Sequence, residues 1–188
     1  TLVSSPFASG DYAFRLRLAS ASTAIQFDEP VSDTITEPGG RKYYRFDVSA
    51  GQGIYFDRLD NDFSSEFEYA LFRSSGERVL VNGRLQFVPP NAGTYYLEAR
   101  RRNSTGTIAF QLRELSAIPL TPIDQTVTGV RGSDAESVII RFQGEAGQEN
   151  RLQTSFQLFD AANNFVSTAP SVGSFYVLPY SGTYSVIG

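Results

Sequence analysis

The feature that most constrains this chain is a strand pattern near its start, Gly10–Leu18, which returns at Gly106–Arg113. Its apolar residues fall on every second position, and this alternation is typical of a half-buried β-strand. The second copy closes a long series of predicted strands, whereas too few residues precede the first copy for it to close anything. We therefore expect the first copy to complete a unit whose other strands lie at the C-terminal end of this chain or in another molecule. The residues that would fill that gap are Tyr12, Phe14, Leu16 and Leu18.

Short motifs recur in the same order along the chain, and such internal repetition decides how the sequence divides. Predicted strands separated by turns with Gly, Pro and Asn fill both halves. The clearest repeated pairs are Ala50-Gly51-Gln52 with Ala146-Gly147-Gln148, Tyr69–Phe72 with Phe156–Phe159, and Leu85–Tyr95 with Ser174–Tyr184.

These repeats predict two units that are out of phase with the ends of the sequence. The first unit, about 26–116, contains the whole pattern of strands. The second unit, about 117–188, lacks the last strand, and residues 1–20 form a donor strand of that kind. The chain has no Met, so we expect it to be a processed product or one piece of a longer polypeptide.

Composition favours an all-β fold and excludes several kinds of function. Hydrophobic residues make up 41% of the 188 residues, and 16 Gly and 9 Pro accompany them. The net charge of −4 gives no basic footprint for nucleic acid, and no apolar run is long enough to span a membrane. Because the chain has neither His nor Cys, it cannot form a Ser-His-Asp triad, a thiolate nucleophile or the usual zinc site. We therefore predict that the protein is not an enzyme.

The ordered motifs resemble those of the bacterial pre-peptidase C-terminal domain family. The resemblance is carried by Tyr43–Gln52, by Tyr69–Phe72 and by Pro89–Leu97, and it extends over nearly all of both units. The second unit departs from the pattern, because Gly144-Glu145 changes the spacing and its middle region is shorter. Gly10–Leu18 resembles the closing strand of such domains in tandem arrays of large secreted bacterial proteins.

The resemblance implies a fold, a location and an ancillary role. Members are jelly-roll-like β-sandwiches of about eight strands, they are not catalytic, they accompany peptidases or lie within surface proteins, and some bind calcium. We thus expect two tandem jelly-roll-like β-sandwich domains, the second completed by a donated or permuted strand. We also expect an extracellular or cell-surface location.

Two sets of residues are candidates for ligand binding. The oxygens of Asp57, Asp60, Asn61 and Asp62 are hard ligands of the kind that calcium prefers, although a polar turn with solvated carboxylates explains the same residues. Calcium is the one cofactor that the sequence suggests. Tyr43, Tyr55 and Tyr96 fall on the face opposite the predicted core, where exposed rings stack on sugars, but tyrosine is also common in strands generally.

Two charged groups have a simple structural interpretation. Glu66 and Glu68 share a strand face, as the carboxylates of a glycosidase do, but a solvated face is the preferred interpretation. Arg100-Arg101-Arg102 is a basic run that forms either a solvated turn or a contact with an acidic patch on the neighbouring unit.

The sequence therefore predicts a non-catalytic structural repeat of an extracellular fibre or surface protein. Its partners would be copies of itself or adjacent repeats, joined head to tail by β-strand complementation. The alternative is a carbohydrate- or calcium-binding accessory module of a secreted hydrolase, with surface polysaccharide as the partner.

Overall fold

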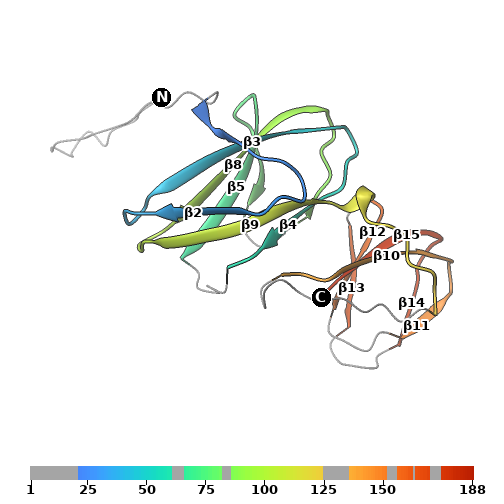
Figure 1. Ribbon diagram of the computed structural model, residues 1–188. Coiled ribbons are helices and arrows are strands. Elements are labelled where there is room, and N and C mark those ends of the chain that lie inside the picture. Colours follow the sequence, from blue (N-terminus) through green and yellow to red (C-terminus); the bar gives the residue numbers. More distant parts are fainter. Residues whose placement is uncertain are drawn as a thin grey trace, which may run out of the picture.

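The computed structural model describes residues 21–60, 66–81, 86–124, 136–151, 156–162, 164–169 and 175–188. The regular secondary structure of these residues is almost entirely β-strand, and the predicted all-β class is confirmed. Figure 1 shows one group of strands, β1–β9, joined through the short 3-10 helix η2 (Leu115–Ala117) to a second group, β10–β15. We call these groups the first unit and the second unit. The predicted unit boundary at residues 116 and 117 falls inside η2, while residues 1–20 lie outside the described part of the chain.

The first unit is a sandwich of two sheets. Its described strands are β1 (Thr23–Ala24), β2 (Val31–Ile35), β3 (Arg41–Val48), β4 (Ile54–Arg58), β5 (Phe67–Arg73), β6 (Arg78–Val81), β7 (Gln86–Phe87), β8 (Gly93–Arg101) and β9 (Gly106–Glu114). Among them, one sheet has the order β1-β3-β8-β5-β6 and the other has the order β2-β9-β4-β7. The chain passes repeatedly from one sheet to the other, as in jelly rolls.

The core of the first unit follows directly from the alternation in its strands. In β3, for example, Tyr44, Phe46 and Val48 are buried, while Arg45 and Asp47 between them are exposed. The inward residues of both sheets meet between the layers, as expected for packed sheets. The buried core residues are Ile25, Ile35, Tyr44, Phe46, Val48, Ile54, Phe56, Phe67, Tyr69, Leu71, Tyr95, Leu97, Ala99, Ile108, Phe110 and Leu112.

The second unit repeats most of this arrangement on a smaller scale. Its described strands are β10 (Ile139–Gly144), β11 (Glu149–Arg151), β12 (Phe156–Asp160), β13 (Phe165–Ala169), β14 (Phe175–Val177) and β15 (Gly182–Ile187). Among these residues, one sheet has the order β10-β15-β12-β13 and the other is the pair β11-β14. Its buried core consists of Phe142, Phe156, Leu158, Leu178, Tyr184 and Val186.

Two kinds of hydrogen bond occur at matching positions of the two units. The Gly51 N–H donates to the Pro89 carbonyl at 2.8 Å, and the Gly147 N–H donates to the Leu178 carbonyl at 2.9 Å. Both glycines have a positive φ, 76° and 80°, which the turn requires and which glycine adopts without strain. The Tyr95 hydroxyl donates to the Asn91 carbonyl, and the Tyr184 hydroxyl donates likewise to the Tyr180 carbonyl.

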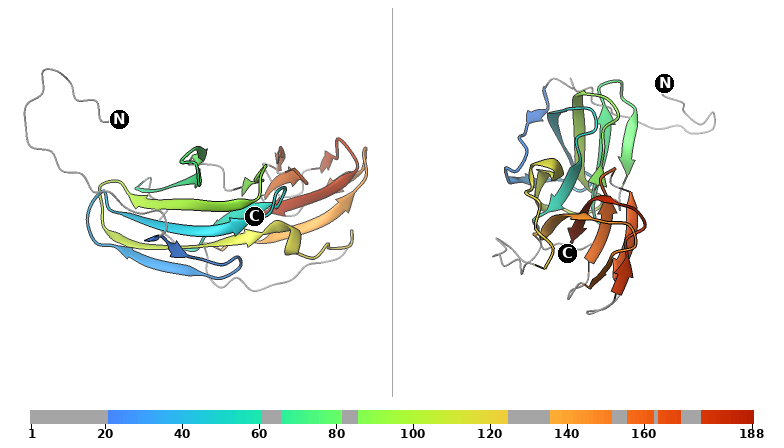
Figure 2. Two further views of the ribbon diagram at one scale, coloured as in Figure 1. Left: turned by 90° about the horizontal axis from the view of Figure 1, so that it is seen from above. Right: turned by 90° about the vertical axis from the view of Figure 1, so that its right-hand side faces the viewer.

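The two units contact each other through a third, small apolar cluster. Its buried members are Tyr55 on β4, Leu115 in η2 and Ile187 on β15, and Ile118, Ile139 and Phe159 pack against them. Figure 2 shows β10–β15 at one end of the first unit, next to the sheet that contains β4 and β9. The outer face of that sheet is therefore partly covered by the second unit.

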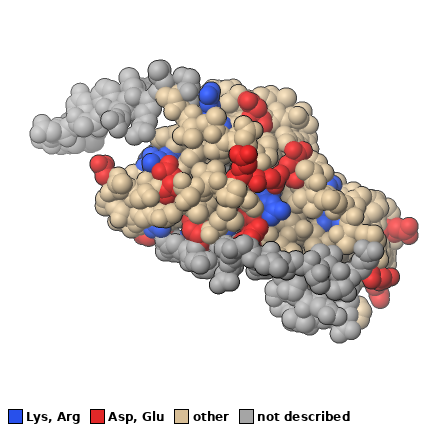
Figure 3. Space-filling view, in the orientation of Figure 1, with Lys and Arg blue, Asp and Glu red and all other residues tan. Residues whose placement is uncertain are grey.

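Charged side chains on the face seen in Figure 3 are mixed in sign. Acidic and basic groups lie next to one another over the described residues of that face, without a broad basic area. No helix in the described ranges is long and apolar enough to cross a membrane.

Candidate functional site

The edge of β11 is the position at which the two units differ most. In the first unit, β4 pairs with β7 on one side and with β9 on the other. In the second unit, β11 pairs with β14 in the same register, because Asn150 lies opposite Tyr176 as Ile54 lies opposite Phe87. Within the residues that the structure describes, no strand pairs with the other edge of β11. An unpaired strand edge presents backbone donors and acceptors to which another strand can add.

The role of β9 shows what such a strand would contribute. Ile108, Phe110 and Leu112 of β9 are buried in the first core, and the Phe110 ring lies 5.1 Å from Tyr44 and 5.0 Å from Phe56, measured between ring centroids. Gly10–Leu18 aligns with β9 without a gap, and Gly10, Ala13, Phe14, Leu16 and Arg17 are identical to their counterparts.

This alignment assigns the four predicted donor residues to positions in β9. Tyr12, Phe14 and Leu16 correspond to Ile108, Phe110 and Leu112 respectively. Leu18 corresponds to Glu114, which is half-buried, so it would lie at the margin of the core. All four donor residues lie outside the described residues, and their role stays a prediction.

A surface groove of about 1110 Å³ runs over the outer face of the sheet that contains β3, β8 and β5. Tyr43 of β3, Tyr96 of β8 and Phe72 of β5 line it, and all three side chains are half-buried. Tyr96 lies directly opposite Phe72 on the neighbouring strand, while Tyr43 lies opposite Glu98. Two of the three tyrosines predicted to stack on sugars are thus brought to one groove.

The third predicted tyrosine, Tyr55, has a different position. Its ring points away from the first core, as the alternation predicts, but the side chain is only 4% exposed because the second unit covers it. Its hydroxyl lies 2.7 Å from Ser137 Oγ, and burial raises the pKa of Tyr55 to about 12. The prediction that this ring is exposed is therefore wrong.

The predicted calcium ligands that are described are occupied by protein contacts. Asp57 is fully buried, and its carboxylate accepts hydrogen bonds from the Ser137 N–H at 3.0 Å and from Gln111 Nε2 at 3.3 Å. Asp60 accepts bonds from Arg58 Nε and from the Ala109 N–H. No group of three or more acidic side chains in the described ranges is arranged to hold a metal ion. Because Asn61 and Asp62 lie outside those ranges, calcium binding stays a prediction.

Asp57 instead belongs to a polar contact between the units that the sequence did not reveal. Burial raises its pKa, and the hydrogen bonds from Ser137 and Gln111 only partly offset that effect. Arg113 Nη1 lies 3.6 Å from the Asp57 carboxylate and 3.9 Å from that of Glu136. The one feature of the sequence that could have indicated this contact is the outward position of Asp57, Gln111 and Arg113 on neighbouring strands.

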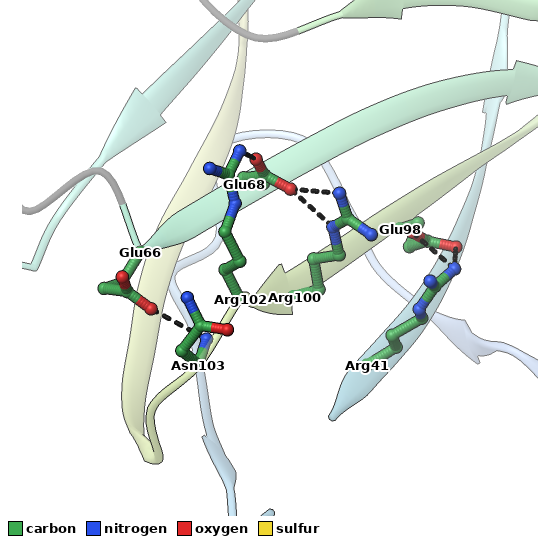
Figure 4. Close-up of polar contacts among 7 residues, drawn as sticks. All are labelled: Arg41, Glu66, Glu68, Glu98, Arg100, Arg102 and Asn103. Atoms are coloured by element: carbon green, nitrogen blue, oxygen red, sulfur yellow. Dashed lines mark hydrogen bonds and ion pairs between the residues drawn. The ribbon is translucent and has the colours of Figure 1, made fainter. Parts of the chain in front are cut away.

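Glu68 of β5 is the partner of two residues of the arginine run, Arg100 near the end of β8 and Arg102 just after it. Figure 4 shows Glu68 between Arg100 and Arg102, with ion pairs to both. These bonds lower the pKa of Glu68, which is buried, so its interpretation as a solvated carboxylate is wrong. Glu66 accepts a hydrogen bond from the Asn103 N–H at 2.7 Å. Arg100 and Arg102 therefore bind an acidic residue of their own unit.

Comparison with known proteins gives structural similarity alone. No family model and no curated protein matches the sequence. Similar solved structures include PliG of Salmonella Typhimurium, a periplasmic inhibitor of g-type lysozyme, with 17% identity and a TM-score of 0.40 over 49% of this chain and 96% of the inhibitor. The pre-peptidase C-terminal domain of a Bacillus anthracis collagenase has 20% identity and a TM-score of 0.39 over 49% and 94%.

PliG of Aeromonas hydrophila, also a periplasmic inhibitor of g-type lysozyme, has 14% identity and a TM-score of 0.39 over 49% of this chain and 96% of that protein. The similar structures thus include a domain of the family that the sequence resembles. Membership of that family stays a prediction.

Proposed function

We propose that this protein is a non-catalytic structural module of a secreted or cell-surface assembly, joined head to tail by β-strand complementation. The edge of β11 accepts residues Gly10–Leu18 of another copy. The observation that carries the proposal is the contrast between β4, which has a strand on each side, and β11, which has one on a single side within the described residues.

The added strand would satisfy both the backbone and the core of the second unit. Its N–H and C=O groups would pair with the edge of β11, and its alternating side chains would set the register. Tyr12, Phe14 and Leu16 would take the positions of Ile108, Phe110 and Leu112, all of which are buried in the first unit. Burying each such side chain contributes about 1.5–3 kcal/mol before the strand is ordered.

A contact between this edge and the donor segment of another copy would also give the assembly a linear form. The donor segment and the acceptor edge are different surfaces of one chain, so their contact is heterologous. A heterologous contact that does not close into a ring generates a filament. Donation within a single chain would close the molecule on itself, and that arrangement is the main competitor.

Light scattering and negative-stain microscopy of the 188-residue chain test the proposal directly. We expect concentration-dependent filaments that disappear when residues 1–20 are deleted and that a free 1–20 peptide blocks. Phe14→Ser removes an inward side chain and should abolish filaments, whereas Arg15→Ser changes the outward neighbour and should leave them intact. Compact monomers at all concentrations, or filaments that persist without residues 1–20, would overturn head-to-tail donation.

The alternative role as an accessory module is favoured by one observation. Tyr43 and Tyr96 line the same groove, on the first unit and away from the edge of β11. A module can both assemble and bind a ligand, so the two roles do not exclude one another.

A further inference from the structure

The groove on the first unit joins aromatic and hydrogen-bonding groups in a single surface. Tyr43, Tyr96 and Phe72 lie on three adjacent strands of one sheet, on the face away from the core. Residues directly opposite on neighbouring strands have Cβ atoms about 4.5–5.5 Å apart, and diagonal neighbours are within reach of aromatic side chains. The three rings therefore form an oblique aromatic row across the sheet.

The charged side chains that line the groove are all paired with groups of opposite charge. Arg41 Nη1 lies 3.1 Å from Glu98 Oε2, and Lys42 Nζ lies 2.8 Å from Asp33 Oδ1. Arg73 Nη1 lies 2.6 Å from Glu77 Oε2. Because these pairs neutralise one another, the described lining does not select a strongly charged ligand. A phosphorylated or polyanionic ligand would have to break an existing ion pair.

Arg41 and Glu98, which are paired as Figure 4 shows, offer planar donors and acceptors. Both residues line the same groove as the aromatic row. A guanidinium and a carboxylate held side by side match neighbouring hydroxyl groups, since one donates and the other accepts. Arg41 keeps an exposed side-chain fraction of 45%, so it can bond a ligand without giving up Glu98. Paired hydroxyl groups on a ring with apolar faces are the chemistry of a saccharide.

We propose that this groove binds a neutral oligosaccharide, with Tyr43, Tyr96 and Phe72 against the sugar faces and Arg41 and Glu98 bonded to ring hydroxyls. The groove, at about 1110 Å³, is slightly larger than the roughly 300–1,000 Å³ found for small-molecule sites. A chain of several sugars fits it better than one. The site lies on the complete unit, so it does not depend on strand donation.

Affinity electrophoresis in native gels with soluble neutral polysaccharides (glucan, mannan, galactan and xylan) tests the proposal, with polygalacturonate and heparin as anionic probes. We expect at least one neutral polymer to retard the protein. Tyr96→Ala and Tyr43→Ala should each weaken that binding about tenfold, the equivalent of one lost ring contact. Added salt should not change it, since screening acts on charges.

A matched control separates loss of the site from loss of the fold. Phe175 is the most exposed large hydrophobic residue described, at 67%, and it lies on the second unit. Phe175→Ala should leave retardation unchanged, and the thermal midpoint of the first unit should be the same in all variants. Three results would overturn the proposal: no retardation by any neutral polymer, retardation by anionic polymers alone, or retardation of Tyr96→Ala and Tyr43→Ala equal to that of the wild type. None of these results depends on whether filaments form.

Discussion

The two units share a framework of turns but bury their cores to different extents. In both units a glycine N–H closes the equivalent turn, and the hydroxyl of the equivalent tyrosine donates to a backbone carbonyl. Yet sixteen buried residues form the core of the first unit, while six form that of the second among the described residues. The two units therefore share local turn contacts, while their described cores differ in the number of buried residues.

Equivalent positions show that the smaller core is also packed differently. Val48 and the buried Pro89 of the first unit correspond to Gly144 and Leu178 of the second. A Cβ atom at Gly144 would lie 2.2 Å from Leu178 Cδ1, so the bulk has moved from one partner to the other. Cores accept such volume-conserving exchanges when the total volume is kept. The units have diverged in side chains while keeping their strand register.

The largest expected loss of stability comes from replacing either of two equivalent leucines. Leu71 on β5 and Leu158 on β12 are both buried, and each Leu→Ala change should cost about 2–5 kcal/mol. Because its described core has fewer buried residues, we expect the second unit to lose its structure in Leu158→Ala while the first unit survives. Hydrogen exchange measured peptide by peptide resolves the two units.

The counterpart variant and the donor peptide complete this test. Leu71→Ala should reduce protection in β1–β9 without unfolding that unit. A free 1–20 peptide should restore protection to the second unit of Leu158→Ala if it occupies the position there that β9 occupies in the first unit. Equal loss of protection in both units, in either variant, would contradict the link between core size and independent stability.

A smaller effect is expected at the equivalent hairpin turns. In the first unit, Arg73 closes the turn by an ion pair with Glu77 that is partly exposed. In the second, the buried Asp160 carboxylate accepts bonds from the Ala162 and Asn164 N–H groups, and the Tyr180 hydroxyl donates to it at 2.6 Å. Asp160→Ala should therefore cost about 1–3 kcal/mol, whereas Arg73→Ala should cost about 0–1 kcal/mol.

The same turn should give the second unit a distinct response to acid. Burial alone would raise the pKa of Asp160, but the hydrogen bonds from Tyr180 and Asn164 outweigh it and lower the pKa. A carboxyl with a lowered pKa contributes stability above its unfolded value near 3.8, and the contribution is lost as the pH falls through the folded value. Chemical unfolding at pH 7 and pH 3 measures the free energy of unfolding at each pH. An equal decrease from pH 7 to pH 3 in wild type and in Asp160→Ala would contradict this prediction.

Much of the fold could be predicted from the sequence, because periodicity and turn chemistry are local. Alternation in Lys42–Val48 identifies the buried face of β3, and Ala-Gly-Gln marks the same turn twice. The face of each strand follows from that pattern, and Tyr43 and Tyr96 were placed correctly away from the core. What alternation cannot give is the identity of the neighbour that covers an outward face.

The errors at Tyr55 and Glu68 have this one cause. Tyr55 points outward but is covered by the second unit, and Glu68 points outward but is enclosed by Arg100 and Arg102. The arginines lie more than thirty positions further along the chain, and only the pairing of β5 with β8 brings them to Glu68. Contacts that depend on strand order and on unit docking carry no local signal in a single sequence.

The smallest expected effect concerns the contact that joins the two units. Burial raises the pKa of Asp57, so the folded chain binds a proton there more tightly than the unfolded chain does. The contact should then lose stability as the pH rises from about 4 through the folded pKa, opposite in sign to the effect of Asp160. When Asp57 is ionised, the hydrogen bonds from Ser137 and Gln111 and the nearby Arg113 keep the contact between the units.

Asp57→Asn should remove this pH dependence while keeping an acceptor for the Ser137 N–H. The thermal midpoint of the second unit, followed from pH 4 to pH 7, should change less with pH in Asp57→Asn than in wild type. Gln111→Ala keeps the carboxylate and removes one donor, so it should steepen the slope by leaving the ionised form less well bonded. The charged neighbours Arg113 and Glu136 are common to all three proteins, so a slope that Asp57→Asn leaves unchanged would assign the pH dependence to them and not to the carboxyl between the units.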